Sequence, residues 1–369
     1  MKSELLLFAA LLTAGYASAE LAGLQTVLTL EPGPANPRNS EGDFVQLKDG
    51  RILFAYTHFT GDAGDDGTAH IAGRFSADGG KTWSPEDTLI LPNEGKQNTM
   101  SVSLLRLNTG EIALVYLRKN SDYDCRPYMR ISTDEAASWN LPTLCIDTPG
   151  YFVVNNDRVI QLSTGRLVIP AARHSLPGQK FRGRGEALCY LSDDNGKTWR
   201  PGKSILEAPE ASRSGLQEPG VIELKDRNAR ARLMMLSRTD QGSQFVSYSA
   251  DGADTWSPAQ PSQLISPVSP ATFERIPESG NILLVWNNHD NTPSELKGKR
   301  TPLSIAVSAD EGASWTTPIN IETNPDGWYC YTAIEFIPGH ALLAYCAGDK
   351  TIGGLNRLKI IRLDLDQLQ

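Results

Sequence analysis

The sequence predicts an all-β fold, a six-bladed β-propeller with four-stranded antiparallel blades, from two repeats and one count. The first repeat is a turn of the form Ser-x-Asp-x-Gly-x-Thr-Trp, clearest at residues 192–199 (SDDNGKTW). Its five full or partial copies start 56, 60, 57 and 59 residues apart. The second repeat is a strand–turn–strand hairpin that recurs six times, about every 58 residues. A mature chain of about 350 residues therefore holds six units, and four strands per unit around an axis form a propeller.

The Asp-containing turns are predicted to be structural. The carboxylate of Asp accepts backbone N–H groups in a tight turn, Gly permits a positive φ, and the closing Trp anchors the turn on its neighbour. Five such turns fit clamps on the blades better than five ligand sites. The structural aspartates are Asp78, Asp134, Asp194, Asp251 and Asp310.

Each hairpin has an alternating strand, a turn that usually contains Gly or Asn, and a nearly continuous apolar strand. A third strand then leads into the Asp-containing turn, and a fourth completes the unit. The last unit, around residues 357–365, lacks the Asp turn, so we expect a strand near residues 24–30 to complete it and close the ring. The hairpins are 44–56, 103–116, 159–171, 221–236, 273–286 and 333–345.

The first 19 residues predict a secretory signal peptide. They contain Lys2, an apolar run over residues 5–12 and an Ala-Ser-Ala cleavage pattern ending at Ala19. Removal of residues 1–19 would leave a single propeller domain, 20–369, that is secreted or periplasmic. No later stretch approaches 18 uninterrupted apolar residues, so no membrane span is expected.

The composition is that of an ordinary soluble globular protein, with 40% hydrophobic and 21% charged residues. The formal net charge of −8 argues against nucleic acid or an anionic membrane as the partner. An anionic ligand would therefore need local arginines that act against the global field. The sequence carries no signal for an oligomeric state.

The five cysteines permit disulfides but leave one unpaired. Cys330 with Cys346, and Cys125 with Cys145, are possible pairs, and buried free thiols are an equally open alternative. Their spacing is not that of metal ligands, and neither a metal nor a cofactor is expected.

Propeller geometry predicts where a ligand would bind. If hairpin turns and Asp turns share one face, the starts of the first strands and the loops between second and third strands share the other. The innermost strands converge there, and polar groups at such a mouth fit a ligand site. Arg38, Arg158 and Arg238 flank strands on this face. The converging segments are 38–41, 98–101, 155–158, 217–218, 269–272 and 329–331.

The Asp-containing turns, six units and leader together resemble the sialidase (neuraminidase) superfamily, whose repeats are called Asp boxes or BNR repeats. In that family an arginine triad binds the sugar carboxylate, a Tyr–Glu pair supplies the nucleophile, and a loop Asp is the acid/base. The segment GLQEPGVIEL, followed by Arg238, resembles the family segment that supplies the glutamate, here Glu218, and the second arginine. Arg300 leads into an Asp box as the family's third arginine does. Tyr331, in YCYTAIEF, resembles the nucleophile.

Two assignments remain open within the resemblance. The loop THFTGDAGDDGTAHIAGRFS occupies the place of the acid/base; Asp62 is also a candidate for contacting the substrate. Aligning the hairpin turns puts Ser40 where the family has its first arginine. Arg38, two residues away, is therefore the candidate, with Arg158 as a substitute. The candidates for the acid/base, in order of preference, are Asp65, Asp66 and Asp62.

The resemblance implies a retaining exo-glycoside hydrolase that releases a terminal acidic sugar, sialic acid or a similar one, from a glycan or glycoconjugate. Guanidinium groups bind a carboxylate bidentately. Because the anomeric centre of a sialic acid carries a carboxylate, a neutral Tyr avoids the repulsion that an anionic nucleophile would meet. The Asp would protonate the leaving oxygen and later activate water. Two alternatives stay open: a lyase or hydrolase of uronic-acid glycans with a His or Tyr base, and a non-catalytic glycan- or protein-binding propeller.

Overall fold

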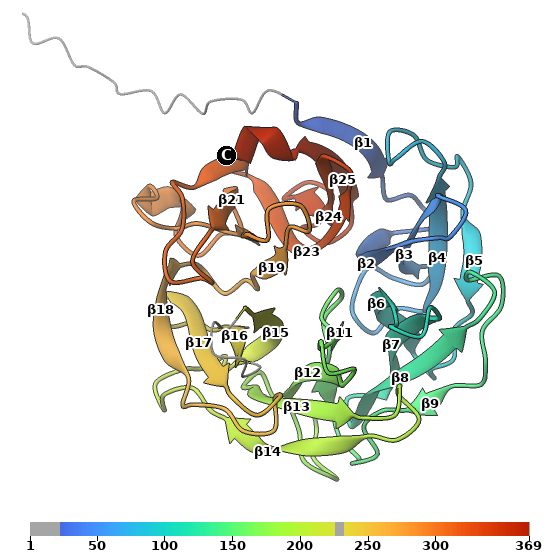
Figure 1. Cartoon of the computed structure of the whole chain (residues 1–369), viewed down its shortest axis with the longest axis horizontal. Coiled ribbons are helices and arrows are strands. Elements are labelled where there is room, and N and C mark those ends of the chain that lie inside the picture. Colours follow the sequence, from blue (N-terminus) through green and yellow to red (C-terminus); the bar gives the residue numbers. More distant parts are fainter. Residues whose placement is uncertain (1–22, 226–231, 369) are drawn as a thin grey trace, which may run out of the picture.

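The computed structural model describes residues 23–225 and 232–368. The predicted leader, residues 1–19, lies outside the described residues, as does the turn of the fourth hairpin. The strands form six antiparallel sheets arranged around a central axis (Figure 1). The predicted six-bladed propeller is therefore confirmed.

The first five blades follow the chain, each from its innermost strand to its outermost. Blade 1 consists of β2 (Arg38–Gln46), β3 (Ile52–Phe59), β4 (Ala69–Ser76) and β5 (Thr88–Leu91). Blade 2 consists of β6 (Asn98–Arg106), β7 (Ile112–Ser121), β8 (Asp124–Ser132) and β9 (Thr143–Leu144). In blade 3 the innermost strand is split in two, and the elements are β10 (Phe152–Val153), β11 (Ile160–Gln161), β12 (Leu167–Arg173), β13 (Glu186–Ser192) and β14 (Arg200–Leu206).

Blade 4 consists of β15 (Gln217–Leu224), β16 (Arg232–Arg238), β17 (Ser243–Ser249) and β18 (Gln260–Ile265). Blade 5 consists of β19 (Thr272–Arg275), β20 (Ile282–Trp286), β21 (Leu303–Ser308) and β22 (Ile319–Glu322). Two short 3₁₀ helices, η1 (Ser294–Leu296) and η2 (Leu365–Leu368), are the helical segments of the described chain. No helix in that part of the chain is long and apolar enough to cross a membrane.

Blade 6 combines the two ends of the described chain. It consists of β23 (Gly327–Ile337), β24 (His340–Asp349), β25 (Leu358–Asp364) and β1 (Gln25–Leu30). β1 pairs antiparallel with β25, from Gln25 opposite Arg362 to Leu30 opposite Leu358. The expected closing strand is thus present, and closure leaves the sheets of the ring with short, protected edges.

The hydrophobic core lies between neighbouring blades. In one cluster, Phe44, Phe54 and Tyr56 of blade 1 pack with Leu342 and Ala344 of blade 6. The second strand of each blade is buried along most of its length because both of its faces meet a neighbouring sheet. This explains why the second half of each hairpin reads as a continuous apolar run.

The five Asp-containing turns share one hydrogen-bond pattern. Asp194 accepts bonds from the Ser192 hydroxyl at 2.8 Å, the Thr198 N–H at 2.9 Å and the Thr198 hydroxyl at 2.6 Å. The equivalent bonds recur at the other four turns. In the first turn, the hydroxyl and N–H of Thr82 lower the pKa of Asp78 to about 2.

These turns lie on the same face as the hairpin turns. Glu135, in the second Asp turn, accepts the N–H of Lys48 from the hairpin turn of blade 1 at 2.8 Å. Glu311, in the fifth, accepts the N–H of Lys225 at 2.7 Å. The starts of the innermost strands therefore lie on the opposite face.

The innermost strands carry a recurrent bulge. Register shifts interrupt β2, β6, β15 and β23, and the gap between β10 and β11 interrupts the innermost strand of blade 3. Each interruption holds one non-glycine residue in the left-handed region, with φ between 46° and 59°. Such residues are uncommon, and bulges re-aim side chains next to active sites. The five residues are Glu41, Ser101, Asp157, Glu218 and Tyr331.

All five cysteines are free and buried. Cys330 and Cys346 lie opposite each other on β23 and β24. Cys125 lies on β8, and Cys145 immediately follows β9. The free-thiol alternative describes this structure, and the two disulfide alternatives do not.

Candidate functional site

The bulges of blades 4 and 6 bring Tyr331 and Glu218 together. The Tyr331 hydroxyl donates a hydrogen bond to Oε1 of Glu218 at 3.1 Å. The other carboxylate oxygen, Oε2, accepts a hydrogen bond from Nη1 of Arg238 at 2.7 Å. Two residues 113 positions apart in the sequence thus form one hydrogen-bonded chain, Tyr–Glu–Arg.

Strand pairing explains why Arg238 reaches Glu218. Arg238 ends β16 and lies opposite Gln217 on β15, next to Glu218. The register shift between Gln217 and Gly220 places Glu218 in the bulge, where its φ is 46°. Its side chain is 10% exposed, so its contacts with Arg238 and Tyr331 are largely desolvated.

Arg300 lies between two aromatic rings. Its guanidinium carbon is 5.2 Å from the ring centroid of Trp328 and 5.2 Å from that of Tyr331. The side chain is buried, and cation–π attraction favours this position. The N–H of Tyr329 donates to the Arg300 carbonyl at 2.9 Å, which joins the loop before β21 to the start of β23.

The guanidinium groups of Arg238 and Arg300 retain free hydrogen-bonding capacity. Nε of each is buried and has no hydrogen-bond partner among the described residues, a feature that Arg158 shares at its separate position. Most buried donors in native proteins are paired, so an orphaned one requires an explanation, and an unbound ligand is one. Two arginines with buried orphan donors beside Glu218 and Tyr331 form a site suited to a carboxylate.

Arg38, at the start of β2, forms a second group with Asp65. Nη1 of Arg38 bonds Oδ1 of Asp65 at 2.6 Å. Nε donates to the Ser40 hydroxyl at 2.9 Å, and Nη2 lies 3.4 Å from Oε1 of Glu41. The guanidinium also lies over the ring of Phe59, at 4.4 Å from its centroid. Ser40, which alignment places at the family's arginine position, is thus a partner of Arg38.

The three loop aspartates have different partners. Oδ1 of Asp62 accepts the N–H of Gly64 at 2.8 Å and shapes the loop itself. Asp66 pairs with Nζ of the buried Lys119 at 2.6 Å. Only Asp65 reaches an arginine of the set, and its side chain is 62% exposed.

The surrounding charges keep Glu218 ionised and Tyr331 protonated. Burial alone would raise the pKa of Glu218, but Arg238 and Arg300 lower it below its ordinary value. Burial, together with the neighbouring Glu218 carboxylate, raises the pKa of Tyr331. A protonated tyrosine therefore faces an ionised glutamate, the arrangement needed for a nucleophile and its base.

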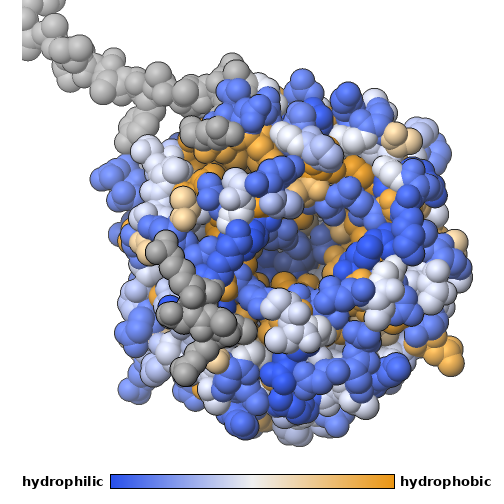
Figure 2. Space-filling model, in the orientation of Figure 1, coloured by the Kyte–Doolittle hydropathy of each residue, from blue (hydrophilic) through white to orange (hydrophobic). Residues whose placement is uncertain are grey.

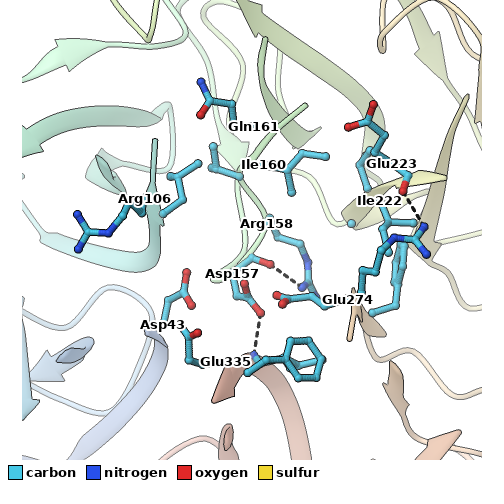
Figure 3. A pocket seen from close by; sticks show the side chains of 18 of the residues that line it. Asp43, Arg106, Asp157, Arg158, Ile160, Gln161, Ile222, Glu223, Glu274 and Glu335 are labelled. Carbon is cyan, nitrogen blue, oxygen red and sulfur yellow. Dashed lines mark hydrogen bonds between the residues drawn. The ribbon is translucent and has the colours of Figure 1, made fainter. Parts of the chain in front are cut away.

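Arg158 does not join this group. Nη1 donates to the Thr272 hydroxyl at 3.1 Å, and Nη2 to the Ala271 carbonyl at 3.0 Å. It lines a cavity of about 1010 Å³ that is also lined by the ends of the innermost strands next to the hairpin turns. In Figure 3 it lies beside Asp157 and Glu274 in that cavity.

This axial cavity is acidic. Asp43, Asp157, Glu274 and Glu335 line it (Figure 3). Enclosure raises the pKa of each, to about 6 for Asp157 and about 7 for Glu335. Seen down the axis, the centre of the ring is hollowed and bordered by hydrophilic side chains (Figure 2). Tyr331, Glu218 and Arg238 do not line this axial cavity, which is therefore separate from the Tyr–Glu–Arg chain.

Comparison with known families gives the chain its place. A family model described as BNR repeat-like domain matches residues 50–337, more than three quarters of the sequence. The chain belongs to the BNR-repeat family. Its six blades fit the fold of the sialidases that it resembles in sequence and structure.

Two sialidases resemble this BNR-repeat propeller in sequence. One, from Micromonospora viridifaciens, is 26% identical over 330 residues, which cover 79% of this chain and 46% of the relative. The other, from Bacteroides fragilis (strain YCH46), is 27% identical over 218 residues, which cover 55% of this chain and 36% of the relative. The chain thus spans less than half the length of either relative.

Solved structures share the fold at lower identity. The leech intramolecular trans-sialidase has a TM-score of 0.71 at 17% identity, covering 93% of this chain and 70% of its own. The NanB sialidase from Streptococcus pneumoniae has a TM-score of 0.70 at 15% identity, covering 94% and 71%. A protein of unknown function from Dyadobacter fermentans DSM 18053 has a TM-score of 0.71 at 17% identity, covering 93% and 99%.

The sequence placed Glu41 in the converging segment 38–41 and Lys119 in a loop on the same face, but it assigned no role to either of them or to Trp328. In the structure Glu41 contacts Arg38, Trp328 packs on Arg300, and Lys119 pairs with Asp66. Glu41 occupies in blade 1 the bulge position that Glu218 and Tyr331 occupy in blades 4 and 6. Burial, only partly offset by Arg38, raises the pKa of Glu41 to about 7.

The histidines of the propeller have structural partners. His174 is 2% exposed, and its Nδ1 is 2.8 Å from the Arg182 carbonyl. His58 and His70 stack with their ring centroids 4.7 Å apart, and Nε2 of His289 is 3.2 Å from the Thr301 carbonyl. Burial lowers the pKa of His174. These contacts give no particular support to a histidine base.

Proposed function

We propose that this protein is an exported, sialidase-like, retaining exo-glycoside hydrolase that releases a terminal acidic sugar from glycans. The observation that carries the proposal is the hydrogen bond from the Tyr331 hydroxyl to Glu218, on a carboxylate that also binds Arg238. A half-buried phenol held against an ionised carboxylate is the pair that a sialidase needs in place of two catalytic carboxylates.

The arginines would bind the carboxylate of the sugar. Arg238 and Arg300 each keep a buried donor without a partner, and both lie close enough to Glu218 to lower its pKa. Arg38 would complete the cluster from blade 1. Local guanidinium groups are required because the chain carries a formal net charge of −8.

The reaction would proceed in two steps. Tyr331 attacks the anomeric carbon while Glu218 takes its proton, and Asp65 protonates the leaving oxygen. In the second step Asp65 takes a proton from water, which attacks the anomeric carbon and breaks its bond to the Tyr331 oxygen. Glu218 returns its proton to Tyr331, and the sugar leaves with retained configuration. A neutral nucleophile suits an anomeric carbon that bears a carboxylate, because no two anions need to approach each other.

Export would follow from the predicted leader at residues 1–19 and place the enzyme outside the cell or in the periplasm. Two relatives of this chain are named sialidases, and this supports sialic acid as the first sugar to test. A uronic-acid glycan and a non-catalytic role are the alternatives that the same experiment separates.

The test is a panel of sialosides and uronic-acid glycosides incubated with purified residues 20–369. We expect release of the sialic acid, with the α-anomer as the first product by proton NMR. Tyr331→Phe should abolish normal turnover while still binding an acidic sugar. If only uronic-acid glycosides are cleaved, the substrate is a uronic-acid glycan and not a sialoside. If no acidic sugar is cleaved or bound, the result favours a non-catalytic propeller.

A further inference from the structure

One arginine of the cluster is already occupied by the protein's own carboxylates. Arg38 donates to Asp65 at 2.6 Å, to the Ala63 carbonyl at 3.4 Å, to Ser40 at 2.9 Å and to Glu41 at 3.4 Å. Arg238 and Arg300, by contrast, each keep an Nε without a partner. A carboxylate that binds all three arginines must therefore displace a partner of Arg38.

Asp65 is the partner that can move most easily. Its side chain is 62% exposed, whereas Glu41 is 6% exposed and receives a second bond from the Ser101 hydroxyl at 3.0 Å. An ion pair with an exposed partner is weak, so a better-placed carboxylate can replace it.

The backbone beneath Asp65 is held from blade 2. The side-chain amide of Asn98 donates to the carbonyls of Asp65 and Gly67 at 2.8 and 3.0 Å. Nζ of Lys119, which lies opposite Asn98 on β7, is 3.1 Å from the Asp65 carbonyl. A rotation of the side chain would therefore free Arg38 without moving the loop.

Building on the proposed function, we propose that Asp65 and the carboxylate of the sugar exchange places on Arg38. In the free enzyme, Asp65 stands where the ligand's carboxylate belongs. Binding of the acidic sugar turns Asp65 away from Arg38, and the released carboxylate takes a proton from solvent. The substrate thereby prepares its own general acid.

The charges around Asp65 explain why an exchange is needed. Protein on several sides would by itself raise the pKa of Asp65, but Arg38, Lys119 and Arg300 lower it. Glu41 on β2, whose pKa is raised to about 7 partly by Asp65 itself, opposes them to the extent that it is ionised. Asp66 is the next carboxyl group in the same loop. Tyr151 and the thiol of Cys125 also face this charge, and both are neutral because burial raises their pKa values.

Free Asp65 is therefore ionised near neutral pH and cannot donate a proton. A bound carboxylate would neutralise Arg38 and Arg300 and break the 2.6 Å contact. Both changes raise the pKa of Asp65 toward the range in which it can act as an acid. Because the complex then binds a proton that the free enzyme does not, ligand affinity should rise as pH falls.

The experiment is calorimetric binding of 2-deoxy-2,3-dehydro-N-acetylneuraminic acid from pH 5 to 8, in buffers of different ionisation enthalpy. Wild type should take up as much as one proton per ligand. Asp65→Asn should bind the analogue roughly 3–10-fold more tightly near neutral pH, with no comparable uptake, because the competing ion pair is absent. Asp66→Asn is the matched control, since it removes the same charge one residue away but leaves Arg38 paired.

Asp66→Asn should keep the proton uptake and gain less affinity than Asp65→Asn. Binding by wild type without proton uptake, or equal gains from the two variants, would overturn the exchange while leaving the proposed function standing. If the wild type and both variants all fail to bind the analogue, the acidic-sugar site itself is rejected, and the exchange with it.

Discussion

Replacing Glu218 with Gln tests the proposed chemistry with little change of shape. The side chain is 10% exposed and makes two contacts, with Arg238 at 2.7 Å and with the Tyr331 hydroxyl at 3.1 Å. Gln keeps a carbonyl oxygen for one of them but cannot accept the tyrosine's proton. A general base typically contributes about 10²–10⁴-fold to a rate, so kcat should fall by that factor.

The same substitution has a predictable effect on stability. Removing the charge leaves the half-buried guanidinium group of Arg238 and the buried one of Arg300 without their counter-ion, which should cost about 1–3 kcal/mol of unfolding free energy. KM should change by less than about tenfold, because both arginines remain to bind the sugar carboxylate.

The assay is steady-state hydrolysis of a fluorogenic sialoside together with a urea unfolding curve. Glu223→Gln is the matched control, because Glu223 lies on the same strand but bonds Ser163 at the hairpin face. Its kcat should stay within about twofold of wild type. A correctly folded Glu218→Gln enzyme that kept more than a tenth of the wild-type kcat would refute the role of Glu218 as base.

Three further predictions concern the scaffold. Asp194→Ala should lower the unfolding free energy by about 1 kcal/mol, as loss of a capping side chain does, and leave kcat unchanged; a large loss of kcat at normal stability would contradict its structural role. Burial and the neighbouring Asp157 raise the pKa of Glu274, so the folded state holds the extra proton and stability falls as pH rises above the unfolded value near 4. Glu274→Gln should therefore raise the unfolding midpoint at pH 8 but not at pH 4, unlike the exposed control Glu210→Gln, and equal midpoints at pH 8 would count against this. A maleimide should label Cys330 and Cys346 only after denaturation, because both are about 1% exposed or less; mass spectrometry of the native protein checks this, and rapid labelling would show that the β23–β24 pair opens.

The fold could be predicted from the sequence because two independent repeats, the Asp-containing turns and the hairpins, recur with the same period. Each Asp turn marks the end of a third strand, and each hairpin marks the innermost pair, so their order along the chain specifies a blade. Closure by β1 could also be predicted, since the last unit offered only three strands.

Tyr331, Glu218 and Arg238 could be nominated because they keep their place relative to neighbouring strands. The first arginine was harder. The bulge between Ser40 and Asp43 adds one residue to β2 and disturbs the count back from the hairpin turn. The count reached Ser40, two residues after Arg38. A non-glycine residue at positive φ, such as Glu41, leaves no mark in the alternation of polar and apolar residues.

The alternative at Arg158 illustrates the same limit of strand counting. In blade 3 the innermost strand stops at Val153 and resumes at Ile160, so the segment between them leaves the sheet. Arg158 is therefore directed to the acidic cavity, where Thr272 and the Ala271 carbonyl bind it. The acidic residues of that cavity come singly from different strands, and no run of sequence brings them together.

The recurrent bulge has the same backbone conformation whichever side chain it carries. The left-handed residue of the bulge is Glu, Ser, Asp, Glu and Tyr in blades 1, 2, 3, 4 and 6, so the fold tolerates different side chains at this equivalent position. Ser101 has the smallest of them, and its hydroxyl reaches Glu41 at 3.0 Å. Position 101 is therefore a site at which a new functional group could be introduced. Replacing Ser101 with Glu, Gln or Tyr would place that group beside the arginines without redesigning a strand.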